Sequence, residues 1–313
     1  MQLHLYKSTT FTRFGSHLTD VFGLFTLGLL LNATTLTIEP HLLPPWYQPL
    51  KQAESVQCET RVPSIAHFGF ATPQLALQAL PPFADCLRVP IGFRVATPSA
   101  LNVWERDGLV PRGTMRSVLD RMRFAKPKFK TKNAAVVHVR RGDRAPIGRL
   151  ISPLPLVKAM LRLGERRVGA STLLTEPLNH EDLDALAPQP ATVREDAEIM
   201  LHAPLLILVN GESAFSGMIA LLRTKPTVVV GACLDERVRC NVLRPGDERI
   251  SVPAPPLSGD PPPQLWMPHA QHQHPLALTP EWVPPNGTGG VWRYHWTAAA
   301  TAFDLASAVE RAA

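Results

Sequence analysis

The sequence predicts an α/β protein whose parallel sheets are covered by helices. Short β-prone apolar segments alternate with helix-sized amphipathic segments, and the connections between them are short. Of the 313 residues, 45% are apolar and 19% are charged, a composition typical of a globular chain that buries a core. This length suits two modest domains or one large domain.

The first unit of this pattern lies at the N-terminus. Residues 3–11 alternate well enough to form a strand, residues 17–31 form an apolar helix, and residues 34–40 form a second strand that Pro40 ends. Gly15 lies in the turn between the first strand and the helix. A glycine in such a loop lets backbone N–H groups approach a ligand.

The next stretch, residues 41–112, is proline-rich and irregular, and only short helices are expected in it. A helix over 112–124 then leads to a strand over 134–139. From there the pattern is regular: helix 152–165, strand 170–177, helices 179–187 and 194–203, strand 204–210, helix 212–224 and strand 226–231. Beyond residue 250 the chain is proline-dense and is expected to wrap the surface, and a helix over 297–312 closes it.

Composition argues against several classes of partner. The net charge of +6 is spread along the chain, and no zinc-finger or RNA-binding signature accompanies its densest basic stretch, residues 123–132, so we do not expect nucleic acid. The apolar run 21–31 is too short to span a bilayer and reads as a buried helix, so no membrane span is expected. The sequence leaves the cellular compartment open.

We expect no metal site. The four cysteines form no CxxC pair, which disfavours zinc. Two disulfides are possible, Cys58–Cys86 and Cys233–Cys240, but the sequence does not fix the connectivity. The Asp-Leu-Asp run at 182–184 has the form of a metal-binding motif but reads as the surface of a helix.

Three junctions between a strand and a helix could carry chemistry, because ligands bind beyond the carboxyl ends of parallel strands. At the first, Gly15 permits close backbone approach and Ser16 could cap the helix, although an ordinary turn has the same sequence. At the second, His138 and Arg140 share one face of a strand end. There one of the two arginines, Arg140 or Arg141, can bind a diphosphate, and the other can pair with Asp143 or with the loop. The alternative is that the strand simply ends in solvent.

The third junction follows the strand 204–210. That strand ends at Asn210, and Ser213, Phe215 and Ser216 open an apolar helix. Hydroxyls and free N–H groups at a helix N-terminus can bind an anion. Simple capping of the helix by Ser213 is the alternative interpretation.

Together these three segments are similar to one enzyme family. "FTRFGSHLTDVFGLFTLGLLLNATTLTIEPHLLPPW" resembles the amino-terminal region of GDP-fucose protein O-fucosyltransferases, which reads roughly "GRFGNQ", a long helix, a strand and "PPW". "VVHVRRGD" resembles the His-x-Arg motif shared by that family and the alpha-1,2- and alpha-1,6-fucosyltransferases. "LVNGESAFS" is similar to their final "GN…SSF" segment. The segments occur in the family's order.

The resemblance implies a GT-B-like enzyme with two Rossmann-like lobes and a nucleotide-sugar donor in the cleft between them. The lobes would be residues 1–130 on the acceptor side and residues 131–250 on the donor side, with 251–313 packing back on both. It implies metal-independent, inverting transfer of fucose from GDP-fucose to a protein or glycan hydroxyl. The residues that it assigns to the donor are Gly15, Ser16, His138, Arg140, Arg141, Asp143, Asp196, Asn210, Ser213, Ala214, Phe215 and Ser216.

Within that set, Arg140 is the arginine expected on the β-phosphate of GDP, where a positive charge neutralises the leaving group. The sequence departs from the family at Ser16 and His17, which replace Asn-Gln, and at Ala214, which replaces a serine. His17 could act as the general base, because imidazole titrates near neutrality, or could pack in the core. These departures keep two alternatives open: a nucleotide-sugar-binding or scaffold protein without turnover, and a GT-B transferase with another nucleotide sugar.

Overall fold

A computed structural model describes residues 1–6, 14–47, 58–62, 67–68, 70, 72–82, 85–122, 124, 133–140, 154–175, 192–209, 213–231, 244, 246–250, 277–283, 291–297 and 299–313. The chain forms two compact units. Unit 1 comprises Met1–Lys126 and Trp282–Arg293, and unit 2 comprises Pro127–Glu281 and Tyr294–Ala313. A separate two-stranded sheet pairs β11 (Ala277–Val283) with β12 (Val291–Thr297).

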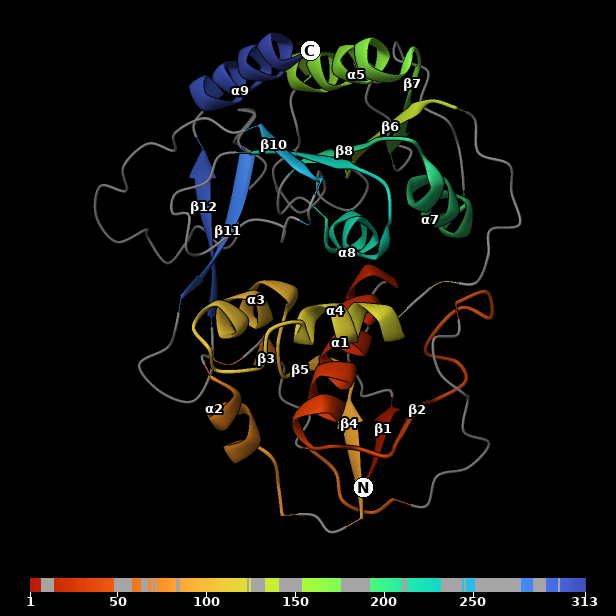
Figure 1. Cartoon of the computed structure of the whole chain (residues 1–313), viewed down its shortest axis with the longest axis vertical. Coiled ribbons are helices and arrows are strands. Elements are labelled where there is room, and N and C mark those ends of the chain that lie inside the picture. Colours follow the sequence, from red (N-terminus) through yellow and green to blue (C-terminus); the bar gives the residue numbers. More distant parts are fainter. Residues whose placement is uncertain are drawn as a thin grey trace, which may run out of the picture. The chain divides into compact units, whose positions relative to one another are not determined.

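Unit 1 is built on a parallel sheet with the order β2-β1-β4. Its strands are β1 (Gln2–Tyr6), β2 (Thr35–Ile38) and β4 (Cys86–Pro90), and a second parallel pair joins β3 (His67–Phe68) to β5 (Phe93–Arg94). The helices of the unit are α1 (Phe14–Leu30), α2 (Pro73–Gln78), α3 (Pro98–Arg106) and α4 (Thr114–Arg121) (Figure 1).

The sheet of unit 1 has one apolar face. Leu3, Leu5, Leu87 and Val89 are fully buried, as is most of the apolar helix α1, which contacts β1 and β2. Because side chains alternate along a strand, the residues next to these four in β1 and β4 lie on the opposite face. That face carries polar side chains, among them His4, Thr37 and Arg88.

Unit 2 is built on a five-stranded parallel sheet with the order β10-β9-β8-β6-β7. The strands are β6 (Ala135–Val139), β7 (Ser171–Thr175), β8 (Leu206–Val209), β9 (Thr227–Val230) and β10 (Glu248–Ile250). Counted from β6, this is the 2-1-3-4-5 order of a doubly wound fold, in which the chain reverses direction across the sheet between the first and third strands. The switch point therefore lies between β6 and β8.

Helices cover both faces of this sheet (Figure 1). On one face, α5 (Leu154–Val168) and α9 (Ala299–Ala312) lie side by side over an aliphatic core from every strand; α7 (Val193–His202) and α8 (Ala214–Leu222) cover the other face. The α5 backbone approaches the sheet closely at Gly164, where a Cβ atom would lie 2.8 Å from that of Ala135. Any larger residue would displace α5 from the sheet.

The structure confirms the α/β class and the parallel sheets. Strands β2, β6, β7, β8 and β9 match, with shifted ends, the strands predicted over 34–40, 134–139, 170–177, 204–210 and 226–231. Helices α4, α5, α7, α8 and α9 match, again with shifted ends, the helices predicted over 112–124, 152–165, 194–203, 212–224 and 297–312. The first strand is described only over β1, and the predicted helix 179–187 lies outside the described residues. None of the helices among the described residues is long and apolar enough to cross a membrane.

One prediction at the first junction is wrong. Helix α1 begins at Phe14 rather than at residue 17, so Ser16 lies inside its first turn and is not a helix cap. The reason is aromatic packing, because the Phe14 ring lies 5.0 Å from the Trp46 ring and 5.8 Å from the Tyr47 ring. These contacts fix the first helical residue against the segment that follows β2.

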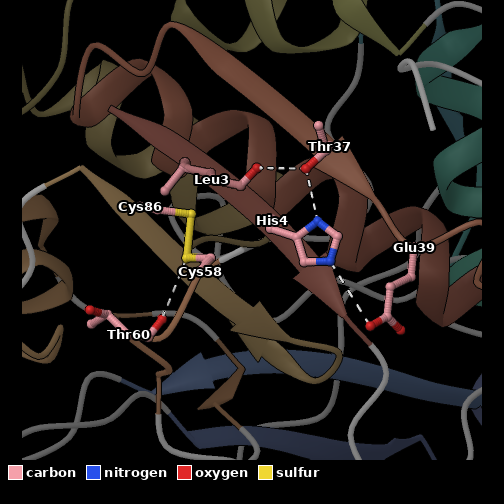
Figure 2. Close-up of a disulfide and its surroundings, with 7 residues drawn as sticks. All are labelled: Leu3, His4, Thr37, Glu39, Cys58, Thr60 and Cys86. Carbon is pink, nitrogen blue, oxygen red and sulfur yellow. Dashed lines mark hydrogen bonds and ion pairs between the residues drawn. A yellow bond between two sulfur atoms is a disulfide. The ribbon is translucent and has the colours of Figure 1, made fainter. Parts of the chain in front are cut away.

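The cysteine pairing is resolved in part. Cys58 and Cys86 form a disulfide with a Cα–Cα distance of 5.5 Å, as one of the predicted pairings proposed. Cys233 and Cys240 lie outside the described residues. The bond ties the segment before Thr60 to the start of β4 in unit 1 (Figure 2).

Candidate functional site

The predicted site residues of unit 2 lie at the switch point of its sheet. His138 is in β6, paired in register with Leu208 of β8, and is only 7% exposed. Its ring meets that of Phe215, in the first turn of α8, edge-on at a centroid distance of 6.1 Å. The strand and the helix that the sequence separates by more than seventy residues are therefore in contact.

Helix α8 presents its N-terminus at this point. Ser213 is its N-cap, with Oγ accepting a hydrogen bond from the backbone N–H of Ser216, and the Ser216 hydroxyl donates to the Ser213 carbonyl oxygen at 3.4 Å. Both serines are buried. Ala214 is the first helical residue. The first N–H groups of a helix have no carbonyl partner within it and carry partial positive charge, which favours an anion there.

Arg140 is the cation nearest in sequence to this end of β6. It follows Val139, the last residue of the strand, and is half-buried. Since β6 and β8 are adjacent and parallel, Arg140 and the α8 N-terminus both lie beyond the carboxyl edge of the sheet. Arg141, Asp143 and Asn210 lie outside the described residues, so their positions remain predictions.

Asp196 lies in the first turn of α7, half-buried, after a capping box formed by Thr192 and Glu195. The last turn of α7 leads directly into the start of β8, so the first turn lies toward the carboxyl edge of the sheet. This is the end of the sheet at which Arg140 is found.

A residue that sequence reasoning missed fixes α7 and α8 to each other. The Arg223 side chain, 3% exposed, donates hydrogen bonds to the carbonyl oxygens of Met200, Ala203 and Pro226. Burial lowers the pKa of Arg223 to about 9, with Arg244 lowering it further and Asp247 raising it. The only signal in the sequence was an arginine at the end of an otherwise apolar helix.

The predicted residues of unit 1 also lie at a switch point. Its strand order reverses between β1 and β4, and Gly15, Ser16 and His17 form the first turn of the helix that follows β1. Gly15 is buried, whereas Ser16 and His17 are half-buried. His17 is therefore not enclosed in the core.

A buried ion pair holds α1 one turn after these residues. The Asp20 side chain is fully buried, and its Oδ1 accepts hydrogen bonds from Arg94 Nε at 2.8 Å and from the Gly92 backbone N–H at 3.3 Å. Burial raises the pKa of Asp20, while Arg94 and His17 lower it. Both Gly92 and Arg94 follow β4, so Asp20 fastens the helix after β1 to the chain after β4.

Comparison of the chain with protein-family models, curated proteins and solved structures finds no significant match. In the part of the chain that the structure describes, no three His, Cys, Asp or Glu side chains are arranged to hold a metal ion. The sequence-predicted residues thus form two described groups: His138, Arg140, Ser213, Ala214, Phe215 and Ser216, with Asp196 on the neighbouring helix, in unit 2, and Gly15, Ser16 and His17 in unit 1.

Proposed function

We propose that the protein is a glycosyltransferase that transfers fucose from GDP-fucose to a hydroxyl group of a protein or glycan. The observation that carries this proposal is the position of Arg140, His138 and the α8 N-terminus at the switch point of a doubly wound sheet. Nucleotides bind at such points. The resemblance of these same segments to the fucosyltransferases supplies the choice of GDP-fucose. In this proposal units 1 and 2 are the lobes of a GT-B-like enzyme.

The chemistry asked of unit 2 is stabilisation of a leaving group. The bond between the anomeric carbon of fucose and the β-phosphate oxygen breaks, and both of its electrons leave with GDP. Arg140 and the N–H groups that open α8 would stabilise the negative charge that grows on the phosphate. Phe215 and His138 would flank the nucleotide. No metal takes part in this scheme.

Unit 1 would supply the acceptor side of the reaction. The acceptor oxygen attacks the anomeric carbon from the face opposite to GDP, which inverts the configuration, and its proton passes to a base. His17 is the candidate base, because it is half-buried at the start of α1 and imidazole can take a proton near neutral pH. Gly15 and Ser16, in the same helical turn, would contribute backbone and hydroxyl contacts to the donor.

The substitutions at Ser16, His17 and Ala214 favour one alternative. A protein that has lost the family's side-chain amide and one phosphate-site hydroxyl could bind a nucleotide sugar without transferring it. The two functions differ in turnover and not in donor binding. A transferase for another nucleotide sugar differs in the donor that is turned over.

The test is release of GDP or UDP from nucleotide sugars in the presence of EDTA, with and without arrays of glycan and peptide acceptors. We expect turnover of GDP-fucose in preference to GDP-mannose and UDP-glucose, and a loss of about 100-fold to 1000-fold in Arg140→Ala. His17→Ala should lower the rate while donor binding is kept. Binding without turnover on any acceptor would support the alternative. Absence of both binding and turnover would overturn the proposal.

A further inference from the structure

The face of the unit 1 sheet opposite α1 carries a row of polar side chains. His4 of β1 is in register with Thr37 of β2 and Arg88 of β4, so the three side chains lie on the same face. His4 Nδ1 and Thr37 Oγ1 are 2.8 Å apart (Figure 2). Sheets of doubly wound folds usually bury both faces under apolar helices. A polar face therefore needs a different explanation.

A fourth chain segment extends this sheet beside β4. The Arg88 N–H donates to the Thr60 carbonyl oxygen at 2.7 Å, the Val62 N–H donates to the Arg88 carbonyl oxygen at 2.9 Å, and Arg61 pairs with Arg88 as a parallel bridge. The Cys58–Cys86 disulfide anchors the segment two to three residues before both arginines (Figure 2). Register and disulfide together hold Arg61 next to Arg88.

The two arginines share one aromatic ring. The guanidinium carbon of Arg88 lies 4.6 Å from the centroid of the Tyr6 ring, and that of Arg61 lies 5.9 Å from it. Tyr6 is the last residue of β1, so the two guanidinium groups lie near the carboxyl end of that strand. Contact with the ring face stabilises each cation, but the two cations repel each other.

Negative charge in this cluster is scarce. Glu39 pairs with Arg88 at 3.2 Å and also lies within ion-pair distance of His4 and His41. Among the described residues no carboxylate pairs with Arg61, which is exposed, and no acceptor reaches the buried Nε of Arg88. Glu39 thus pairs with only one of the two arginines, and Arg61 is left without a carboxylate partner among the described residues.

We propose that Arg61 and Arg88 form a binding site for an oxyanion, a carboxylate or a sulfate ester, carried by the acceptor sugar. Two neighbouring guanidinium groups suit an anion with several oxygens, because each can donate more than one hydrogen bond. The exposed Arg61 is open to the ligand, and Glu39 holds Arg88 in place. The identity of the ligand as the acceptor sugar rests on the proposed transferase function, whereas the anion site itself does not.

The experiment is an NMR titration of the oxidised full-length protein, without nucleotide, that follows the arginine Nε–Hε and backbone signals. The probes are glucuronate, galactose 6-sulfate and neutral glucose. We expect the two charged sugars to shift the signals of Arg61 and Arg88 and glucose to leave them unchanged. Comparison of the two dissociation constants distinguishes a carboxylate ligand from a sulfate ligand.

The matched variants are Arg61→Ala and, as a control, Arg112→Ala, which removes another exposed arginine of unit 1. Arg61→Ala should weaken binding by about tenfold or more, and Arg112→Ala should leave it unchanged. Arg61→Gln serves if the alanine variant fails to fold. Absence of binding, or equal binding by wild type and Arg61→Ala, overturns the site. If the charged sugars bind but GDP-fucose does not, the site stands and the transferase proposal falls.

Discussion

At the scale of single residues, buried ionisable side chains fix the geometry of each unit. Asp20 joins the start of α1 to the chain after β4 in unit 1, and Arg223 joins α7 to α8 in unit 2. Neither is among the residues proposed to touch the substrate. Both hold in position a helix whose first turn carries candidate site residues.

Arg223→Met should lower the free energy of unfolding by about 3 kcal/mol, because the carbonyl groups of Met200 and Ala203 would lose their buried donor. The measurement is urea unfolding followed by circular dichroism. Arg166→Met, at an exposed position of α5 in the same unit, is the control and should change stability by less than about 0.5 kcal/mol. Equal stability of the two variants would show that the Arg223 contacts do not stabilise the fold.

His4 should make stability depend on pH. Burial lowers the pKa of His4, Arg88 lowers it further, and Glu39 partly opposes them. The unfolded chain therefore takes up this proton more readily than the folded protein, and stability falls as the pH drops below the ordinary value of 6.5. His4→Gln should flatten the stability profile between about pH 7 and pH 5 relative to wild type.

The matched comparison is His41→Gln, which removes a largely exposed histidine beside the same Glu39 and so separates the effect of burial from that of the carboxylate. Denaturant unfolding at several pH values gives the slopes. A profile for His4→Gln parallel to that of wild type would contradict the assignment.

At the scale of elements, the sequence predicted the caps of unit 2 better than those of unit 1. Ser213 was expected to open the helix after β8 and does so. The start of α1 was placed too late, because contacts of Phe14 with the distant Trp46 and Tyr47 decide it and no local pattern reports them. Helices α2 and α3 begin at Thr72-Pro73 and Thr97-Pro98, a start signal that the surrounding prolines obscured.

Variants of two helix caps in unit 2 distinguish an effect on stability from an effect on GDP binding. Ser213→Ala and Thr192→Ala each remove a side-chain cap, from α8 and α7 respectively, and each should cost about 1 kcal/mol of stability. Ser213→Ala should weaken GDP binding more than Thr192→Ala does, because Ser213 caps the helix that opens at the switch point. Calorimetric titration and urea unfolding measure the two effects. Equal GDP affinity of the two variants would remove α8 from the donor site.

At the scale of the whole molecule, the α/β class followed from the alternation of strands and helices, but the strand order did not. The order depends on which strands pair across long stretches of chain, such as β6 with β8, and no property of either strand specifies its neighbour. The sequence nevertheless placed Gly15, Arg140 and Ser213 after strands. The structure shows that these three strand ends flank the switch points of the two sheets.

The division into two units predicts separable unfolding. The Cys58–Cys86 bond lies within unit 1 and closes a loop of 28 residues, so its removal should cost that unit about 3–4 kcal/mol. Scanning calorimetry of Cys58→Ala/Cys86→Ala should show a transition of unit 1 at lower temperature and an unchanged transition of unit 2. An equal downward shift of the whole profile would mean that the units unfold together.

Donor binding tests the central claim most directly. Wild type, Arg140→Ala and the control Arg166→Ala are titrated in a calorimeter with GDP, GDP-fucose, GDP-mannose and UDP-glucose in EDTA. Arg166 is exposed near the end of α5 that leads into β7, at the opposite edge of the sheet from Arg140. The account predicts guanine-selective binding by wild type and by Arg166→Ala, lost in Arg140→Ala. Absence of binding to every nucleotide, or equal binding by all three proteins, would contradict it.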